Sequence, residues 1–182
     1  IDADIKAPFT RLTYAEAIDK SGSDKPALRG EMELVNLSEA VKGSDFKVFE
    51  SVIQSGGEVK AINVKNYANI ARRELDGLVD YVGIYGAKGL AWIQYTEEGI
   101  KSPITKFFSE EIINNITATT KAETGDLILI IADKPAVVAQ SLGELRLEMA
   151  RRLNLIDEDK LSFLWVVDFP MFEYNEDDKR WV

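Results

Sequence analysis

The pattern of apolar and polar positions in the first half of the chain predicts strands that alternate with a helix. Residues 46–53 and 58–64 are rich in apolar side chains, and the small residues 55–57 between them favour a hairpin turn. A helix is expected from about residue 70 to 85, because apolar residues recur there at helical spacing: Leu75, Leu78, Val79 and Val82. A third strand is predicted over residues 90–96.

The second half of the chain continues this alternation. Residues 100–108 are expected to be extended, and Pro103 places them at the edge of a sheet. Ser109 is predicted to cap a helix, and residues 127–132, LILIIA, then form a buried strand. The longest helix follows from about residue 134 to 153. Strands linked by hairpins beside long helices favour a two-layer α+β module over a doubly wound sheet.

The pattern of the first 45 residues predicts short elements. Thr13 and Glu16 fit a capping box that opens a short helix, and Gly22 is well placed to end it. Asn36 is expected to cap a second short helix that ends near Gly43.

The last twenty residues predict a strand and a hairpin. Residues 163–167 are continuously apolar, as in a strand buried on both faces, and Pro170 should end that strand. Residues 171–174 and 180–182 flank a polar turn and are expected to pair. Because the chain stops within this hairpin and begins on Ile1 without a methionine, we expect it to be a piece of a larger protein.

The composition narrows the possible chemistry. The 182 residues include no cysteine and no histidine, which removes thiolate chemistry, the commonest general base and the usual zinc ligands. The net charge of −9 argues against a freestanding nucleic-acid binder. No stretch resembles a signal peptide or a membrane-spanning helix, so a cytoplasmic protein is expected.

The known site motifs are missing or weak. Glycine-rich phosphate-binding motifs are absent, so no cofactor-binding residue is predicted. Acidic clusters at 97–98, 157–159 and 176–178 lack the spacing of a calcium loop, so we interpret them as solvated turns and predict no metal site. Asp168 follows a strand predicted to be buried, where an unpaired carboxylate would be costly, and a structural role is favoured over a catalytic one.

One turn is kept as a candidate site. Asp24, Lys25 and Arg29 form a dense polar group directly after the first predicted helix, and they are the residues we expect to lie near a substrate. The aromatic residues 92, 95, 107 and 108 could stack on RNA bases, although packing in the core explains them more simply. By residue chemistry alone, the chain carries no self-sufficient active site.

Four stretches in the same order resemble bacterial-type aspartyl-tRNA synthetases: Leu12–Met32, Ile84–Ile93, Gly125–Asp157 and Phe163–Val182. In that family, a class II catalytic domain is interrupted by an inserted GAD domain. The resemblance implies a β-β-α-β-β-α module with an antiparallel sheet and helices on one face. It also implies that residues 1–36 and 161–182 are edges of the catalytic domain, with the insert over residues 37–160.

The resemblance places no catalytic or ATP-binding residue of the family on this chain, so the isolated chain is expected to be inactive. The parent enzyme would use ATP and Mg²⁺, bind tRNA and form a homodimer. Ala27 stands where the family usually has an aspartate, which weakens the case for a substrate role of that turn.

Two roles for the module remain open. It could assist in positioning the tRNA acceptor arm, or it could be a structural or protein-docking module without RNA contact. A ring of lysines on one face, Lys60, Lys65, Lys88 and Lys106, would favour RNA, whereas exposed aromatic residues on the sheet would favour docking. A third possibility, an independent enzyme, has no support in the residues.

Overall fold

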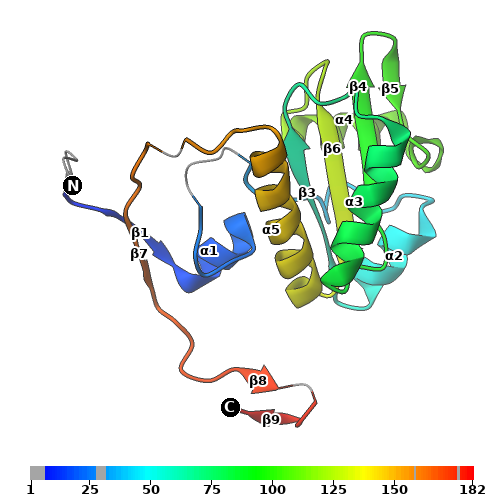
Figure 1. Cartoon of the computed structure of the whole chain (residues 1–182). Helices are drawn as coiled ribbons and strands as arrows, with labels where there is room; N and C mark the ends of the chain where they lie inside the picture. Colours follow the sequence, from blue (N-terminus) through cyan, green and yellow to red (C-terminus); the bar gives the residue numbers. More distant parts are fainter. Residues whose placement is uncertain (1–6, 28–31, 158, 176) are drawn as a thin grey trace.

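The computed structural model describes residues 7–27, 32–157, 159–175 and 177–182. A five-stranded antiparallel sheet lies at the centre of residues 32–157, which we call the sheet module (Figure 1). The order across the sheet is β2-β3-β6-β4-β5. These strands are β2 (Val35–Asn36), β3 (Glu58–Val64), β4 (Ala91–Thr96), β5 (Gly99–Lys101) and β6 (Leu127–Asp133).

Helices cover both faces of this sheet. The helices α3 (Arg72–Ile84) and α5 (Pro135–Arg152) pack on one face, and α2 (Lys47–Gln54) and α4 (Glu110–Thr120) pack on the other. The α+β class and the antiparallel sheet are confirmed, but the expectation of two layers with helices on one face is wrong. The reason lies in β6, where Leu129 faces one helical layer and Ile128 the other, and both are fully buried.

The helix α2 replaces a predicted strand and supplies part of the second helical layer. Phe46, Phe49 and Ile53 are spaced three and four residues apart and turn toward the same apolar cluster. Phe49 is 2% exposed, whereas its neighbour Val48 is 53% exposed. The predicted short helix after Asn36 is also wrong, because residues 38–43 form turns.

The other predicted helices are confirmed. Apolar periodicity located α3 and α5, and Ser109 caps α4 by accepting a hydrogen bond from the Ile112 amide at 3.2 Å. The edge strand is also present, because β5 is the last strand of the sheet order. Beyond it the chain is not extended as predicted but forms a short 3-10 helix, η1 (Thr105–Phe107).

The segments on either side of the module pair with each other. β1 (Thr10–Thr13) runs parallel to β7 (Leu164–Val167), and α1 (Tyr14–Ser21) lies beside α5 (Figure 1). The capping box of Thr13 and Glu16 is confirmed, and Gly22 ends α1 in the left-handed conformation. The predicted hairpin is confirmed as β8 (Tyr174–Asn175) and β9 (Arg180–Trp181).

The predicted burial of the 163–167 strand is wrong. β7 pairs with β1 in a two-stranded sheet, and the Trp165 side chain is 59% exposed. Neither apolar cluster found in the described part of the chain includes a residue of β7. An apolar run alone therefore did not identify a strand covered on both faces.

Candidate functional site

The turn predicted as a site follows α1 directly. Asp24 is half-buried and Lys25 is exposed, and the Lys25 amide donates a hydrogen bond to the Ser23 hydroxyl at 3.1 Å. Arg29 lies outside the described residues. The structure therefore places two of the three candidate residues on one accessible turn.

Two glycines bring this turn into backbone contact with α5. Gly22 has a φ of 68°, and a Cβ added there would overlap the Ala139 carbonyl oxygen and lie 2.9 Å from the Gly143 Cα. A Cβ added to Gly143 would lie 2.9 Å from the Ser21 carbonyl oxygen. Only glycine at both positions allows the end of α1 to approach α5 this closely.

A buried arginine holds the far end of the same turn. Arg146 of α5 is 4% exposed, and its Nη2 donates to the Ala27 carbonyl oxygen at 2.6 Å, across 119 residues of sequence. Burial lowers the pKa of the Arg146 guanidinium, and the nearby Glu33 carboxylate opposes that shift. A buried cation is tolerated only where it has such partners.

A buried lysine fixes α1 from the sheet. Lys60 of β3 is 4% exposed, and its Nζ lies 2.6 Å from Asp19 Oδ1 and 3.5 Å from Glu58 Oε1. The Leu34 amide also donates to the Lys20 carbonyl oxygen at 2.8 Å. We call this set of contacts between residues 19–27 and Lys60, Gly143 and Arg146 the α1 junction.

The four lysines proposed as an RNA-binding ring do not act together. Lys60 is enclosed by the α1 junction, on the α5 side of the sheet. Lys65 is paired with Asp126 at 2.8 Å beside the end of α4, on the other side. Lys88 and Lys106 are exposed, and the Lys106 ammonium lies 5.2 Å from the centre of the Phe107 ring.

The aromatic residues considered for RNA stacking belong mainly to the core. Tyr95 and Phe108 are 7% and 8% exposed, and both lie in the apolar cluster on the α2 and α4 side. Phe107 stacks on Phe46 with ring centres 5.3 Å apart, and Trp92 is partly buried against α3 and α5. Packing therefore accounts for this group, as the simpler interpretation expected.

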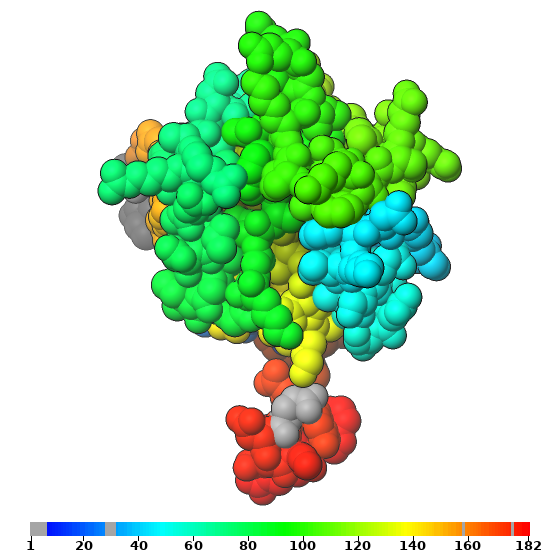
Figure 2. Space-filling model, turned by 90° about the vertical axis from the view of Figure 1, so that its right-hand side faces the viewer, coloured from blue at the N-terminus to red at the C-terminus, as the bar shows by residue number. Residues whose placement is uncertain are grey.

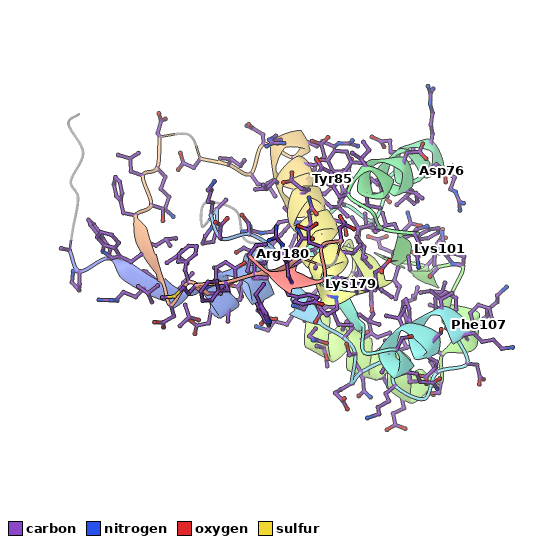
Figure 3. The ribbon with its side chains drawn as sticks, turned by 90° about the horizontal axis from the view of Figure 1, so that it is seen from below. Asp76, Tyr85, Lys101, Phe107, Lys179 and Arg180 are labelled. Carbon is purple, nitrogen blue, oxygen red and sulfur yellow. The ribbon has the colours of Figure 1, made fainter. Side chains whose placement is uncertain are left out.

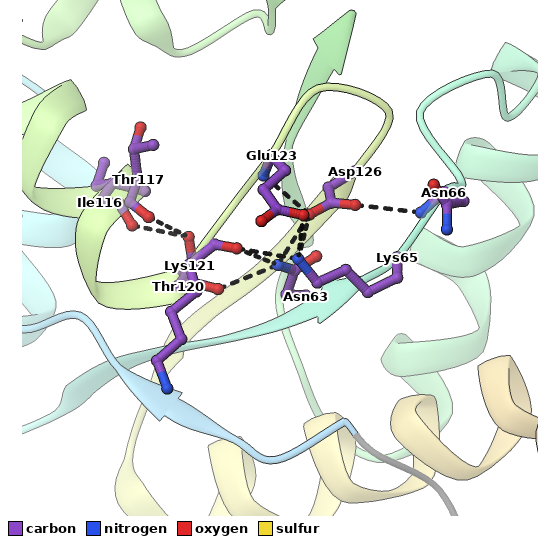
Figure 4. Close-up of polar contacts among 9 residues, drawn as sticks. All are labelled: Asn63, Lys65, Asn66, Ile116, Thr117, Thr120, Lys121, Glu123 and Asp126. Atoms are coloured by element: carbon purple, nitrogen blue, oxygen red, sulfur yellow. Dashed lines mark hydrogen bonds and ion pairs between the residues drawn. The ribbon is translucent and has the colours of Figure 1, made fainter.

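A second polar cluster surrounds Asp126, directly before β6 (Figure 4). The carboxylate accepts hydrogen bonds from Lys65 Nζ at 2.8 Å, Asn63 Nδ2 at 3.2 Å, and the amides of Glu123 at 2.9 Å and Asn66 at 3.2 Å. Burial alone would raise the pKa of Asp126, but these hydrogen bonds lower it below its ordinary value.

The pairing is reciprocal, since the hydrogen bond to Asp126 raises the pKa of Lys65. With four donors around it, this carboxylate is suited to holding two turns together rather than to accepting a substrate proton. No local sequence pattern identifies this cluster, because its members come from two segments about sixty residues apart.

The remaining acidic candidates are surface groups where they are described. Asp168 is exposed and has a φ of 58°, so the burial argument made for it fails. Glu158 and Glu176, each part of an acidic cluster, lie outside the described residues. Within the described ranges, no group of three or more acidic side chains is close enough to hold a metal ion. Over the same ranges, no helix combines the length and apolar character needed to cross a bilayer.

The segment after the module exposes large apolar side chains. We call these residues the aromatic face: Phe163, Trp165, Phe169, Met171, Phe172 and Trp181. Trp165 is 59% and Trp181 is 68% exposed. Figure 2 shows the end of this segment projecting from the body of the molecule. Such a concentration of exposed apolar area is typical of a surface that another part of a protein covers.

The comparisons with known proteins agree on one family. The model of the GAD domain matches residues 49–142. Over 98% of its length, the chain is 58% identical to a protein of Heliobacterium modesticaldum named aspartate–tRNA(Asp/Asn) ligase, and it covers 29% of that protein. A Staphylococcus saprophyticus protein named aspartate–tRNA ligase is 52% identical over 99% of the chain, which covers 31% of the relative.

A third relative, from Bacillus cereus and named aspartate–tRNA(Asp/Asn) ligase, is 54% identical over 98% of the chain, with 30% of the relative covered. The chain thus spans about three tenths of the length of these relatives. Among solved structures, a hypothetical protein of Pyrococcus horikoshii OT3 matches with a TM-score of 0.38 and 22% identity, over 56% of this chain and 58% of that one.

Proposed function

The chain belongs to the GAD domain family, and from this we propose that it is the inserted module of an aspartate–tRNA ligase together with the segments that flank the insertion. The observation that carries the proposal is the identity of 51–58% over nearly the whole chain to ligases of which it covers about 30%. The similarity extends beyond the matched residues 49–142 into both flanks, as expected if module and flanks belong to one enzyme.

The parent enzyme would activate aspartate with ATP and Mg²⁺ and transfer it to tRNA in the cytoplasm, as a class II synthetase and a homodimer. Among the described residues, we identify no side chain placed to act as acid, base or nucleophile in these steps. Its best-placed buried charges, Lys60 and Asp126, are both occupied by structural partners. We therefore propose that the isolated chain is inactive, and that Asp24, Lys25 and Arg29 lie near the substrate only in the complete enzyme.

For the module, a structural and docking role has more support than RNA binding. The predicted lysine ring is not available, since Lys60 is enclosed and Lys65 is paired, and the net charge is −9. The exposed aromatic residues lie on the flank and not on the module's sheet, so they support contact between the flank and the rest of the ligase rather than docking through the sheet. Assistance with the tRNA acceptor arm remains the second candidate, carried by the exposed Lys88 and Lys106.

The first experiment compares the full-length protein with this chain in aspartate-dependent exchange of pyrophosphate into ATP. We expect exchange with the full-length protein and none with the chain. Failure of the full-length protein to exchange with aspartate would contradict the proposed activity, and exchange by the chain alone would contradict its assignment as an inactive part.

The second experiment titrates the chain with tRNA for aspartate at low and at physiological salt, with an unrelated tRNA as control. Docking without RNA contact predicts binding that is absent or disappears with salt. Saturable binding that survives physiological salt and prefers the cognate tRNA would instead support the acceptor-arm role.

A further inference from the structure

We propose that the inserted module sets the position of the 22–27 turn in the catalytic domain, with Gly143 and Arg146 of α5 as the positioning residues. The inference rests on the proposed function, because it assigns a role to Asp24 and Lys25 in a ligase. It gives the module a task that needs no RNA contact. The module would fix the position of one turn near the substrate through contacts from its own helix and strand.

The glycine pair holds the backbones of α1 and α5 in direct contact. Gly22 and Gly143 leave no space for a Cβ at either position, and the atoms in contact belong to the backbones of α1 and α5. A backbone contact of this kind cannot be adjusted by a change of side-chain rotamer. Any displacement of α5 is therefore passed directly to the start of the turn.

Arg146 controls the other end of the turn. Its guanidinium is buried and donates to the Ala27 carbonyl at 2.6 Å, so one polar contact fixes the backbone three residues after Asp24. An apolar residue would fill this part of α5 at a lower desolvation cost. The planar guanidinium also constrains the direction of the carbonyl as well as its distance.

Lys60 adds a third point of attachment, at the last turn of α1. Its ammonium contacts both the carboxylate of Asp19, at 2.6 Å, and the Asp19 carbonyl oxygen, at 3.3 Å. The three attachments come from β3 and α5, which pack together through the centre of the sheet module. The position of the turn is thus fixed by the core of the sheet module and not only by the flanking segment that contains the turn.

The test uses the full-length ligase with two substitutions at the junction, Gly143→Ala and Arg146→Met. Each has a matched control outside it. Gly77→Ala changes a helical glycine with open space around its Cβ position, and Arg152→Met removes an arginine on the same helix that pairs only with Glu148 among the described ion pairs. We measure kcat and KM for aspartate in pyrophosphate exchange, the melting temperature, and the Kd for tRNA.

We expect kcat/KM for aspartate to fall about 10- to 100-fold in both junction variants, because a displacement of about 1 Å near a substrate has effects of this size. The Kd for tRNA should stay within about twofold, and both controls should match the wild type. Arg146→Lys, which keeps a cation and a donor, should recover part of the loss. A loss of stability alone would not produce that split between aspartate activation and tRNA binding.

Asp19→Asn serves as a milder variant in case the others do not fold, since Asp19 is 65% exposed. A smaller fall in the same direction is expected. Wild-type kinetics in every folded junction variant would overturn this inference and leave the proposed function standing. An inactive wild-type full-length protein would overturn the proposed function itself, and the inference with it.

Discussion

At the residue scale, three buried charges of the module each join two segments that are distant in the sequence. Asp126 connects the turn after β3 to the turn after α4, and Lys60 connects β3 to α1. Arg146 connects α5 to the 22–27 turn. Buried ionic groups are costly unless each finds partners, so these three residues specify which segments lie together as well as stabilising the fold.

The Asp126 cluster should make the free energy of unfolding depend on pH in the acid range. The folded-state pKa of Asp126 lies below the ordinary value of about 3.9. Its contribution is therefore complete above about pH 5 and is lost as the pH falls through the ordinary and then the lower folded-state pKa. Asp126→Asn should lower the free energy of unfolding by about 1–3 kcal/mol at pH 7, because Lys65 is half exposed and can be solvated when its partner is lost.

Urea unfolding of both proteins between pH 7 and pH 2 provides the measurement. The difference between wild type and variant should stay constant down to about pH 5 and then shrink. A difference that does not change with pH would show that the carboxylate is not the stabilising group.

The Lys60–Asp19 pair should be worth more than a surface pair at nearly the same distance. A double-mutant cycle with Lys60→Met and Asp19→Asn should give a coupling above about 1 kcal/mol in urea unfolding. The control pair, Lys101–Glu98, is separated by 2.7 Å but is 55% and 79% exposed, and should give less than about 0.5 kcal/mol. Equal couplings would contradict the view that the α1 junction is held through Lys60.

At the element scale, the second layer of helices depends on α2. Phe49 lies against the core on one side of α2 and Val48 points away from it. Phe49→Ala should lower the free energy of unfolding by about 3–5 kcal/mol, and Val48→Ala by less than about 0.5 kcal/mol. Chemical denaturation followed by far-UV circular dichroism measures both, and comparable losses at the two positions would contradict the helical register.

How far the sequence predicts the elements depends on their length. α3 and α5 extend over three or more turns, so apolar spacing and end residues located both of them. α2 has 8 residues, and over so short a run Phe46, Phe49 and Ile53 fit a strand as well as a helix. That error removed α2 from the expected fold, whereas the expectation of a single helical layer came from the family resemblance.

For the candidate turn, the sequence predicts the local residues but not their partners from distant parts of the chain. Its polar residues could be recognised because they are adjacent in the sequence, from Asp24 to Arg29. The contacts of Gly143 and Arg146 with the turn cross more than a hundred residues. No local pattern identifies those partners, which is why the α1 junction was found only in the structure.

At the scale of the whole molecule, the sheet module and the aromatic face lie apart. From below, Asp76, Lys101 and Phe107 mark the side of the module away from the β1–β7 pair (Figure 3). Neither apolar cluster of the described residues contains a residue from 161–182. The module's stability should therefore not depend on that segment.

Removal of residues 161–182 should change the melting temperature by less than about 4 °C, corresponding to about 1 kcal/mol. It should also reduce self-association at high concentration, because the aromatic face is removed. Differential scanning calorimetry and light scattering measure the two effects. A large drop in melting temperature would mean that the flank contributes to the module's core.

The parallel pairing of β1 with β7 has a consequence for how the protein can evolve. Parallel neighbours cannot be joined by a tight turn, so some crossover must carry the chain from Thr13 back to Leu164 in any version of this protein. Closing a longer crossover costs only about 0.6 kcal/mol for each doubling of its length. A whole folded domain can therefore be inserted into or deleted from the crossover between β1 and β7 while the two strands keep their register. This crossover is a position at which domain insertion is tolerated.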